Sequence, residues 1–202
     1  MLRYAITDRK LFNGNEEQRQ DALVRVAAHW SSEGINFVQI REKDLAAGPL
    51  TELSRRVIAA VRIAGSGTKV VVNSRADVAV AVAADGVHLT STAGELTVSQ
   101  ERRLYEAAGL ASPVVTVSCH SLDEVRRAAV QRPDAILFGP VYEKVVGGIV
   151  VVPGAGVEAL RAACELASPV KVYALGGVTL ANAPECVAAG SAGIAAIRLF
   201  TT

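Results

Sequence analysis

One short pattern occurs four times in this chain, and its recurrence strongly limits the folds open to it. Each copy follows an Ala-rich helical stretch and ends in an apolar run; at a spacing of roughly fifty residues, the copies are 33–40, 85–89, 134–139 and 192–197. Four further apolar runs alternate with them, at 4–7, 70–73, 114–117 and 172–175. Eight short buried strands alternating with helices predict a closed (β/α)8 TIM barrel. In such a barrel, chemistry is expected at the carboxyl ends of the strands.

Composition indicates one globular domain spanning residues 1–202, half of them apolar. Lys and Arg number 21 and Asp and Glu 20, and this near-zero net charge favours neither a nucleic-acid nor a membrane partner. No apolar run reaches the length of about 18 residues that a membrane span needs, and the first residues do not resemble a leader peptide. The three cysteines form no C-x-x-C pair, which favours reduced thiols and a cytoplasmic protein.

Apolar spacing and cap residues predict the helices between the strands. Helices are expected over about 16–32, 49–63, 75–84, 99–108 and 121–131, and from near 157 and near 180. Because the chain continues only a few residues past the eighth strand, we expect the last helix to be short or missing. A second copy of the chain could cover that open flank, which makes a homodimer our expectation.

The segment 145–156 departs from the strand-helix alternation. It combines Val and Ile with four glycines and one proline. A segment of this length between a strand and a helix suits either a mobile lid over a ligand or a small hairpin on the rim. The sequence leaves both alternatives open.

Polar side chains follow the second expected strand. Gln39 and Arg41 share one face of that strand and would point into the barrel mouth, with Lys43 just beyond them. An amide, a guanidinium and an ammonium together suit an anionic or heteroaromatic ligand. The alternative is a purely structural salt bridge between Arg41 and Glu42.

The third and fourth strands carry two ambiguous residues. Asn73 could contact a ligand or cap the following helix. His88 lies within a strand, where a histidine is more often a hydrogen-bonded core residue than a member of a site.

The end of the fifth strand holds the best candidate for proton transfer, His120, which precedes a helix. A helix N-terminus disfavours the imidazolium, so a neutral base is expected there near pH 7. Cys119 invites comparison with a nucleophile, but neighbours on a strand point to opposite sides, so we do not expect a Cys-His pair.

The last two strands suggest a phosphate site. Barrels often bind phosphate with backbone N–H groups in the loops after strands seven and eight. Gly176 and Gly177 allow a close backbone approach, and Arg198 could add a positive charge.

Taken in order, several motifs make the chain similar to the thiamine phosphate synthases and their paralogues, the thiazole tautomerases. These motifs lie at 39–43, 73–77, 84–89, 117–121, 137–142 and 176–178, and the similarity covers nearly the whole length. The resemblance implies a (β/α)8 barrel and a small phosphorylated thiazole ligand. It also implies a phosphate site at Gly176, Gly177 and the last strand.

The two branches of that family differ in chemistry. The synthase joins a pyrimidine diphosphate to the thiazole phosphate and uses Mg²⁺, which prefers hard oxygen ligands. The family's synthases have an Asp where this chain has Ser74, a second Asp where 90–95 has none, and a Thr-rich loop ending in Lys where 143–148 stands. The resemblance is therefore closer to the tautomerase branch, with no metal and no cofactor expected.

The tautomerase aromatises a carboxythiazole phosphate by a proton shift, and the resemblance assigns a role to each candidate residue. His120 would be the general acid and base, while Gln39, Arg41, Lys43, Asn73 and Ser118 would bind the ring or its carboxylate. The phosphate would be held by Gly176, Gly177, Ala196, Ile197 and Arg198, although Arg198 replaces the small Ser usual in the family. Two alternatives stay open: the Mg²⁺-dependent synthase and a non-catalytic binder of thiazole or thiamine phosphates.

Overall fold

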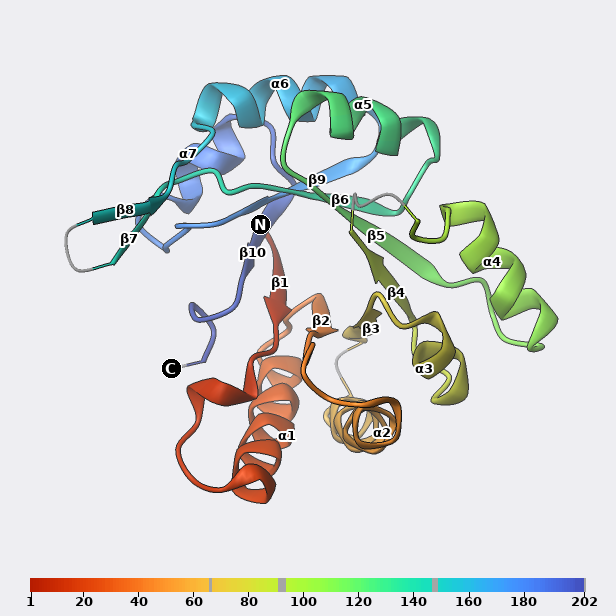
Figure 1. Ribbon diagram of the computed structural model, residues 1–202. Helices are drawn as coiled ribbons and strands as arrows, with labels where there is room; N and C mark the ends of the chain where they lie inside the picture. The colour runs from red at the N-terminus through yellow and green to blue at the C-terminus, as the bar shows by residue number, and fades with distance from the viewer. Residues whose placement is uncertain (66, 91–93, 147–148, 202) are drawn as a thin grey trace.

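The computed structural model describes residues 1–65, 67–90, 94–146 and 149–201, and its centre is a closed barrel of eight parallel strands (Figure 1). Around the barrel the strands follow the order β1-β10-β9-β6-β5-β4-β3-β2. The predicted TIM-barrel fold is confirmed. The strands are β1 (Leu2–Ile6), β2 (Phe37–Ile40), β3 (Lys69–Asn73), β4 (Gly86–Leu89), β5 (Val114–Cys119), β6 (Ala135–Phe138), β9 (Lys171–Leu175) and β10 (Gly193–Ala196).

Helices form the outer ring, and most lie within a few residues of their predicted positions. In the described part of the chain these are α1 (Glu16–Ser32), α2 (Ala47–Ile63), α3 (Ala76–Ala81), α4 (Val98–Ala107), α5 (Leu122–Val130), α6 (Val157–Ala167) and α7 (Ala183–Ala188), with a short 3-10 helix, η1 (Arg9–Leu11), after β1. A capping box starts α1, in which Asn15 and Gln18 exchange side-chain and backbone hydrogen bonds. Among the described helices we find no candidate for a membrane span.

Among the described residues, no helix follows β10, as the sequence predicted. The C-terminal segment lies instead on the side of the ring between α7 and α1 (Figure 1). The indole N–H of Trp30 on α1 donates to the carbonyl of Phe200, which ties this segment to the barrel's outer layer.

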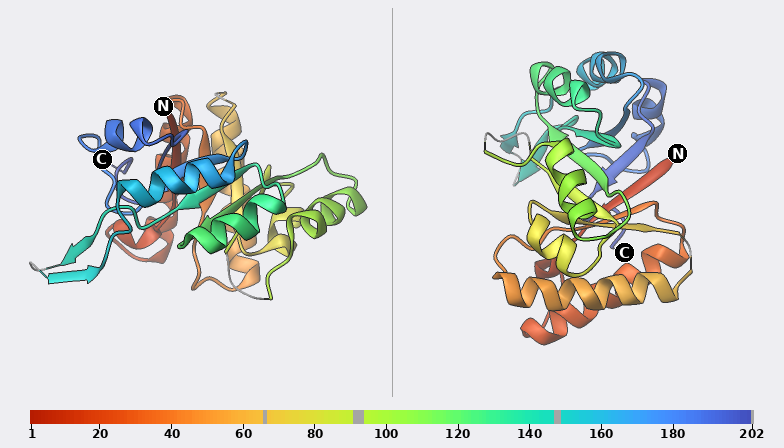
Figure 2. Two further views of the ribbon diagram at one scale, coloured as in Figure 1. Left: turned by 90° about the horizontal axis from the view of Figure 1, so that it is seen from above. Right: turned by 90° about the vertical axis from the view of Figure 1, so that its right-hand side faces the viewer.

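The segment after β6 forms a hairpin. Strands β7 (Lys144–Val146) and β8 (Ile149–Val152) pair antiparallel, and the hairpin projects away from the barrel (Figures 1 and 2). The hairpin interpretation is therefore confirmed for the described part of 145–156, whereas residues 147 and 148 lie outside the described residues. On β8, Ile149 is 69% exposed and Val151 is 50% exposed.

The inside of the barrel is closed by aromatic rings. The ring of Tyr4 stacks on Phe37 with centroids 5.3 Å apart and meets Tyr173 edge-on at 5.7 Å. These rings belong to a cluster with Ile6, Val71, Ala135, Leu137 and Ala195. Such a packed interior leaves no pore, so polar side chains that point inward near the strand ends line pockets at the mouth.

Candidate active site

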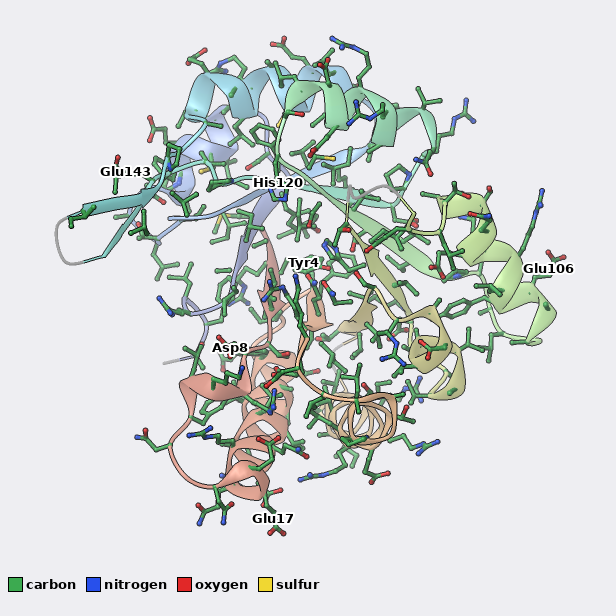
Figure 3. The ribbon with its side chains drawn as sticks, in the orientation of Figure 1. Tyr4, Asp8, Glu17, Glu106, His120 and Glu143 are labelled. Atoms are coloured by element: carbon green, nitrogen blue, oxygen red, sulfur yellow. The ribbon has the colours of Figure 1, made fainter. Side chains whose placement is uncertain are left out.

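Two adjoining pockets lie at the carboxyl ends of the strands. The larger has a volume of about 650 Å³ and the smaller about 180 Å³. His120, Leu175 and Ile197 line both, so the pockets share a wall. The two parts therefore form one continuous candidate site around His120, which lies near the middle of the barrel (Figure 3).

The smaller pocket is lined by polar side chains. All six polar residues predicted to contact the ring of a ligand or its protons line it: Gln39, Arg41, Lys43, Asn73, Ser118 and His120. Gln39 Nε2 donates to Asn73 Oδ1 over 2.9 Å, while buried Gln39 Oε1 accepts no hydrogen bond from the described residues. The capping alternative for Asn73 is wrong, because α3 starts after Arg75 and has no side-chain cap.

The alternative salt bridge between Arg41 and Glu42 is not the one the structure forms. Glu42 is buried and pairs with Arg9, whose Nη1 lies 2.9 Å from Glu42 Oε2. Thr7 Oγ1 donates to Glu42 Oε1 over 2.6 Å and accepts from the backbone N–H of Arg41 over 2.9 Å. Arg41 and Lys43 line the smaller pocket, as predicted.

The hydrogen bonds of His120 fix its tautomer. Its Nδ1 lies 2.5 Å from the carbonyl oxygen of Gly139, which can only accept, so Nδ1 must carry a hydrogen. In the neutral ring Nε2 then has a free lone pair, as a base requires. The backbone N–H of His120 donates to Glu124 Oε2 over 2.6 Å at the start of α5.

Cys119 is unsuited to nucleophilic chemistry, as the sequence predicted. Its side chain is fully buried on the other side of the strand from the pockets. Burial, reinforced by the nearby Glu124 carboxylate, raises the pKa of the Cys119 thiol to about 12, so the thiolate is scarce at neutral pH.

His88 is both a core residue and part of the pocket wall. It is 2% exposed, and both ring nitrogens have partners: Nδ1 lies 2.8 Å from Thr116 Oγ1 and Nε2 lies 2.7 Å from Ser118 Oγ. Burial, together with the positive charges of Arg41 and Lys43, lowers the pKa of His88 to about 3. The ring is therefore neutral near pH 7.

The larger pocket contains the predicted phosphate residues. Gly176, Gly177, Ala196, Ile197 and Arg198 all line it. Both glycines have positive φ, +91° and +65°, and an added Cβ would lie 2.6 Å from Pro140 or Tyr142. Glycine is therefore required here by packing as well as by backbone conformation.

Sequence reasoning missed three polar residues of the larger pocket: Asp8, Tyr142 and Glu143. Asp8 follows β1, so its place at a strand end was an available signal. Tyr142 donates its hydroxyl to Glu185 Oε2 over 2.8 Å, a contact that spans 43 residues and leaves no mark in the local sequence.

Ser74 and part of the segment 90–95, where the resemblance led us to expect metal ligands in a synthase, line a third pocket of about 540 Å³ together with Glu42. The Ser74 hydroxyl donates to Glu95 Oε1 over 2.8 Å, and the backbone N–H of Thr90 donates to Oε2 over 2.7 Å. No three His, Cys, Asp or Glu residues in the described ranges could jointly hold a metal ion. Residues 91–93, outside the described part, are Ser, Thr and Ala and add no carboxylate. This donor set does not fit a Mg²⁺-diphosphate site.

Comparison with known proteins gives one consistent family. Residues 3–200 match the family described as "Thiamine monophosphate synthase". A Geobacter sulfurreducens protein named "Putative thiamine-phosphate synthase" is 38% identical over 199 residues, which cover 96% of this chain and 84% of the relative. A Methanoculleus marisnigri protein named "Thiamine-phosphate synthase" is 32% identical and covers the same shares of the two chains.

A solved structure agrees with these relatives. The "Thiamine phosphate pyrophosphorylase" from Pyrococcus furiosus superposes with a TM-score of 0.75 at 26% identity, covering 97% of this chain and 85% of that one. Fold and pockets together define a single (β/α)8-barrel protein with a candidate site at the carboxyl ends of its strands. More particularly, the chain belongs to the thiamine monophosphate synthase family, a family of enzymes of thiamine biosynthesis.

Proposed function

We propose that this chain binds a phosphorylated thiazole in the two adjoining pockets and catalyses a metal-free proton shift that aromatises a carboxythiazole phosphate. The observation that carries the proposal is the geometry of His120. Its Nδ1–H is held by Gly139, which leaves Nε2 unprotonated in a neutral ring that lines both pockets.

In this proposal the phosphate occupies the larger pocket. Gly176 and Gly177 expose backbone there, and the segment 196–198 faces them with the positive charge of Arg198. The ring then extends into the smaller pocket, where Arg41 and Lys43 would face its carboxylate and Gln39, Asn73 and Ser118 supply hydrogen bonds. Phosphate binding remote from the reacting carbons would hold the ring in place for proton transfer.

The proton shift needs one group that both accepts and donates. His120 Nε2 would take a proton from one carbon of the ring, and the imidazolium so formed would return a proton to another atom of the same molecule. Atoms and electrons balance without an oxidant or a second substrate. Negative charge that develops on the ligand in between would be stabilised by Arg41 and Lys43.

The second candidate is the transferase, thiamine phosphate synthase. The names of the relatives favour it over the isomerase, since each is named as a synthase or as a pyrophosphorylase. The site beside Ser74 argues against it. Glu95 accepts hydrogen bonds from Ser74 and Thr90, and Glu42, which also lines that pocket, is paired with Arg9. No three His, Cys, Asp or Glu residues in the described ranges could jointly hold a metal ion. A non-catalytic binder of thiazole phosphates is the third candidate, and a base at His120 is what favours an enzyme.

One paired assay separates these candidates. Purified protein is given the non-aromatic carboxythiazole phosphate with a chelator, and in parallel the pyrimidine diphosphate and thiazole phosphate with Mg²⁺. Chelator-resistant aromatisation supports the isomerase. Formation of thiamine phosphate only with Mg²⁺ establishes the transferase and overturns our proposal. Binding of the thiazole without turnover in either assay would identify a binder.

We also propose that the enzyme needs no cofactor, acts in the cytoplasm and is a homodimer. Support for the dimer comes from the exposed apolar residues of β8. Light scattering coupled to gel filtration would measure the mass directly, and a monomer at micromolar concentration would reject the dimer.

A further inference from the structure

A chain of hydrogen bonds runs through the barrel interior to the smaller pocket. It begins at Tyr4 on β1, whose hydroxyl lies 3.1 Å from Thr116 Oγ1 on β5. Thr116 Oγ1 lies 2.8 Å from His88 Nδ1 on β4, and His88 Nε2 lies 2.7 Å from Ser118 Oγ. Tyr4, Thr116 and His88 are buried, whereas Ser118 is partly exposed and lines the pocket. Only the last hydroxyl of the chain can therefore reach a ligand.

The number of available hydrogens determines which atom donates in each of these hydrogen bonds. If His88 carries its hydrogen on Nε2, then Tyr4 donates to Thr116, Thr116 donates to Nδ1, and Nε2 donates to Ser118. Every buried donor is then satisfied. The Ser118 hydrogen is left over and is free to point into the pocket.

The opposite tautomer of His88 leaves one buried hydroxyl hydrogen without an acceptor. With the hydrogen on Nδ1, His88 donates to Thr116, and the hydroxyls of Thr116 and Tyr4 have only each other as remaining partners within the described residues. One buried hydroxyl hydrogen then has no acceptor, which disfavours this tautomer by about tenfold or more. The doubly protonated ring is excluded near pH 7, because burial keeps the pKa of His88 far below that range.

We propose that Tyr4, Thr116 and His88 hold Ser118 as a hydrogen-bond donor toward the bound ligand, with His88 acting as a positioning residue. This inference rests on the proposed function only for the identity of the ligand. It gives the two histidines opposite tautomers: His120, which lines both pockets, has an unprotonated Nε2, and His88 has a protonated Nε2 directed at Ser118.

The opposite tautomers of His120 and His88 would both assist the proposed proton shift. As His120 removes a proton, negative charge grows on the ligand, and a hydroxyl already oriented as a donor stabilises that charge without reorganisation. The ligand must therefore present a hydrogen-bond acceptor, such as a ring nitrogen or a carboxylate oxygen, to Ser118. Gln39 also lines this pocket, and its buried Oε1 instead lacks a donor within the described residues.

Nitrogen NMR tests the tautomer without any assay of activity. In protein labelled with ¹⁵N-histidine, long-range ¹H–¹⁵N spectra distinguish protonated from bare ring nitrogens, and the only other histidines, His29 and His120, serve as exposed and opposite-tautomer references. We expect His88 near pH 7 to show a protonated Nε2 and a bare Nδ1. A protonated Nδ1, or an equal mixture of the two tautomers, would overturn the proposal.

Ligand binding tests the consequence for Ser118. Titration with the aromatic carboxythiazole phosphate should show binding about 10- to 100-fold weaker for Ser118→Ala, the range for one lost hydrogen bond to a polar or charged acceptor. His88→Met should weaken binding to a similar extent. The double variant should bind no worse than either single variant, and His88→Gln, whose amide N–H can still donate to Ser118, should recover most of the affinity.

Two results would contradict the assignment of His88. One is unchanged affinity in His88→Met when Ser118→Ala is weakened, and the other is additive losses in the double variant. If the wild-type protein binds no thiazole phosphate at all, the proposed function fails, while the NMR experiment still decides whether Ser118 is held as a donor.

Discussion

Arg9 and Glu42 form a buried ion pair that joins the ends of the first two strands. Arg9 Nη1 lies 2.9 Å from Glu42 Oε2, and the two side chains are only 6% and 2% exposed. Glu42 also accepts from Thr7, which in turn holds the backbone of Arg41. Arg41 and Lys43, which line the smaller pocket, are therefore the sequence neighbours of a carboxylate that Arg9 and Thr7 hold in place.

We predict that breaking this pair lowers both the stability of the fold and the affinity for the ligand. Arg9→Met leaves the Glu42 carboxylate buried without its cation, which typically costs about 3–5 kcal/mol of folding free energy. Glu42→Gln should cost less, because Arg9 still pairs with Asp44 and Glu16. Urea unfolding measures both free energies, and titration with the thiazole phosphate measures binding.

An exposed pair provides the matched control. Arg55 and Glu52 lie 3.6 Å apart on α2 with more than half of each side chain exposed, so Arg55→Met should cost about 0–1 kcal/mol. If Arg9→Met and Arg55→Met lower the free energy of unfolding by equally small amounts, then the pair between Arg9 and Glu42 does not stabilise the fold as its burial indicates.

His120 is predicted to control turnover but not folding. His120→Asn removes the base at Nε2, and loss of a general acid and base typically slows turnover by about 100-fold or more. Thermal unfolding of the variant should stay close to that of the wild type, because His120 is exposed at the mouth of the barrel. His29→Asn, on the surface of α1, is the control and should keep full activity. Wild-type turnover by a folded His120→Asn enzyme would reject the catalytic role.

Two glycines with nearly equal φ allow the cost of left-handed backbone to be measured separately from the cost of steric crowding. Gly177 has φ of +65° and Gly109 has φ of +68°, but an added Cβ would lie 2.6 Å from Tyr142 Cβ at Gly177 and would meet nothing within 4 Å at Gly109. Gly109→Ala should therefore cost about 1–2 kcal/mol from left-handed backbone alone. Gly177→Ala should cost about 1–3 kcal/mol more from overpacking and should weaken phosphate binding.

Calorimetry of both variants, with inorganic phosphate and with the thiazole phosphate as ligands, checks this expectation. Equal destabilisation of the two variants would mean that the loop at Gly177 moves freely away from Tyr142. Unchanged phosphate binding in a folded Gly177→Ala protein would place the phosphate elsewhere.

The sequence predicted the barrel and much of its mouth because both depend on local patterns. A buried strand followed by a helix is readable from apolar spacing, and the barrel then brings every strand end to one side. His120, Gln39 and Gly176 were found in this way, and the structure places them in adjoining pockets. Their chemical roles stay predictions, since position alone does not show what they bind.

What the sequence could not predict depends on contacts between distant residues. Glu42 pairs with Arg9, 33 residues away, rather than with its neighbour Arg41, whose side chain lines the smaller pocket. Asn73 contacts Gln39 instead of capping α3, because the helix begins only after Arg75. The hydrogen bonds that link Tyr4 to Ser118 likewise join residues on β1, β4 and β5, so no local sequence motif reveals them.

Folding stability should depend on pH through His88. Burial lowers the pKa of His88 to about 3 in the folded protein, whereas an unfolded histidine titrates near 6.5. Between these values the unfolded chain binds one proton more than the folded protein. The stability linked to His88 is therefore fully present above about 6.5 and is lost as the pH falls, by up to about 1.4 kcal/mol per pH unit.

Comparison with His88→Gln isolates this contribution, because glutamine does not titrate. Glu101, whose pKa burial raises to about 7, acts in the opposite direction, stabilising the fold at low pH and less so as the pH rises through 7. That effect is common to both proteins and cancels in their difference. In urea unfolding at a series of pH values, the advantage of wild type over His88→Gln should shrink steadily below about pH 6.5. A difference that stays constant with pH would mean that His88 accepts a proton in the folded barrel, and Ser118 would then lose its fixed donor orientation on acidification.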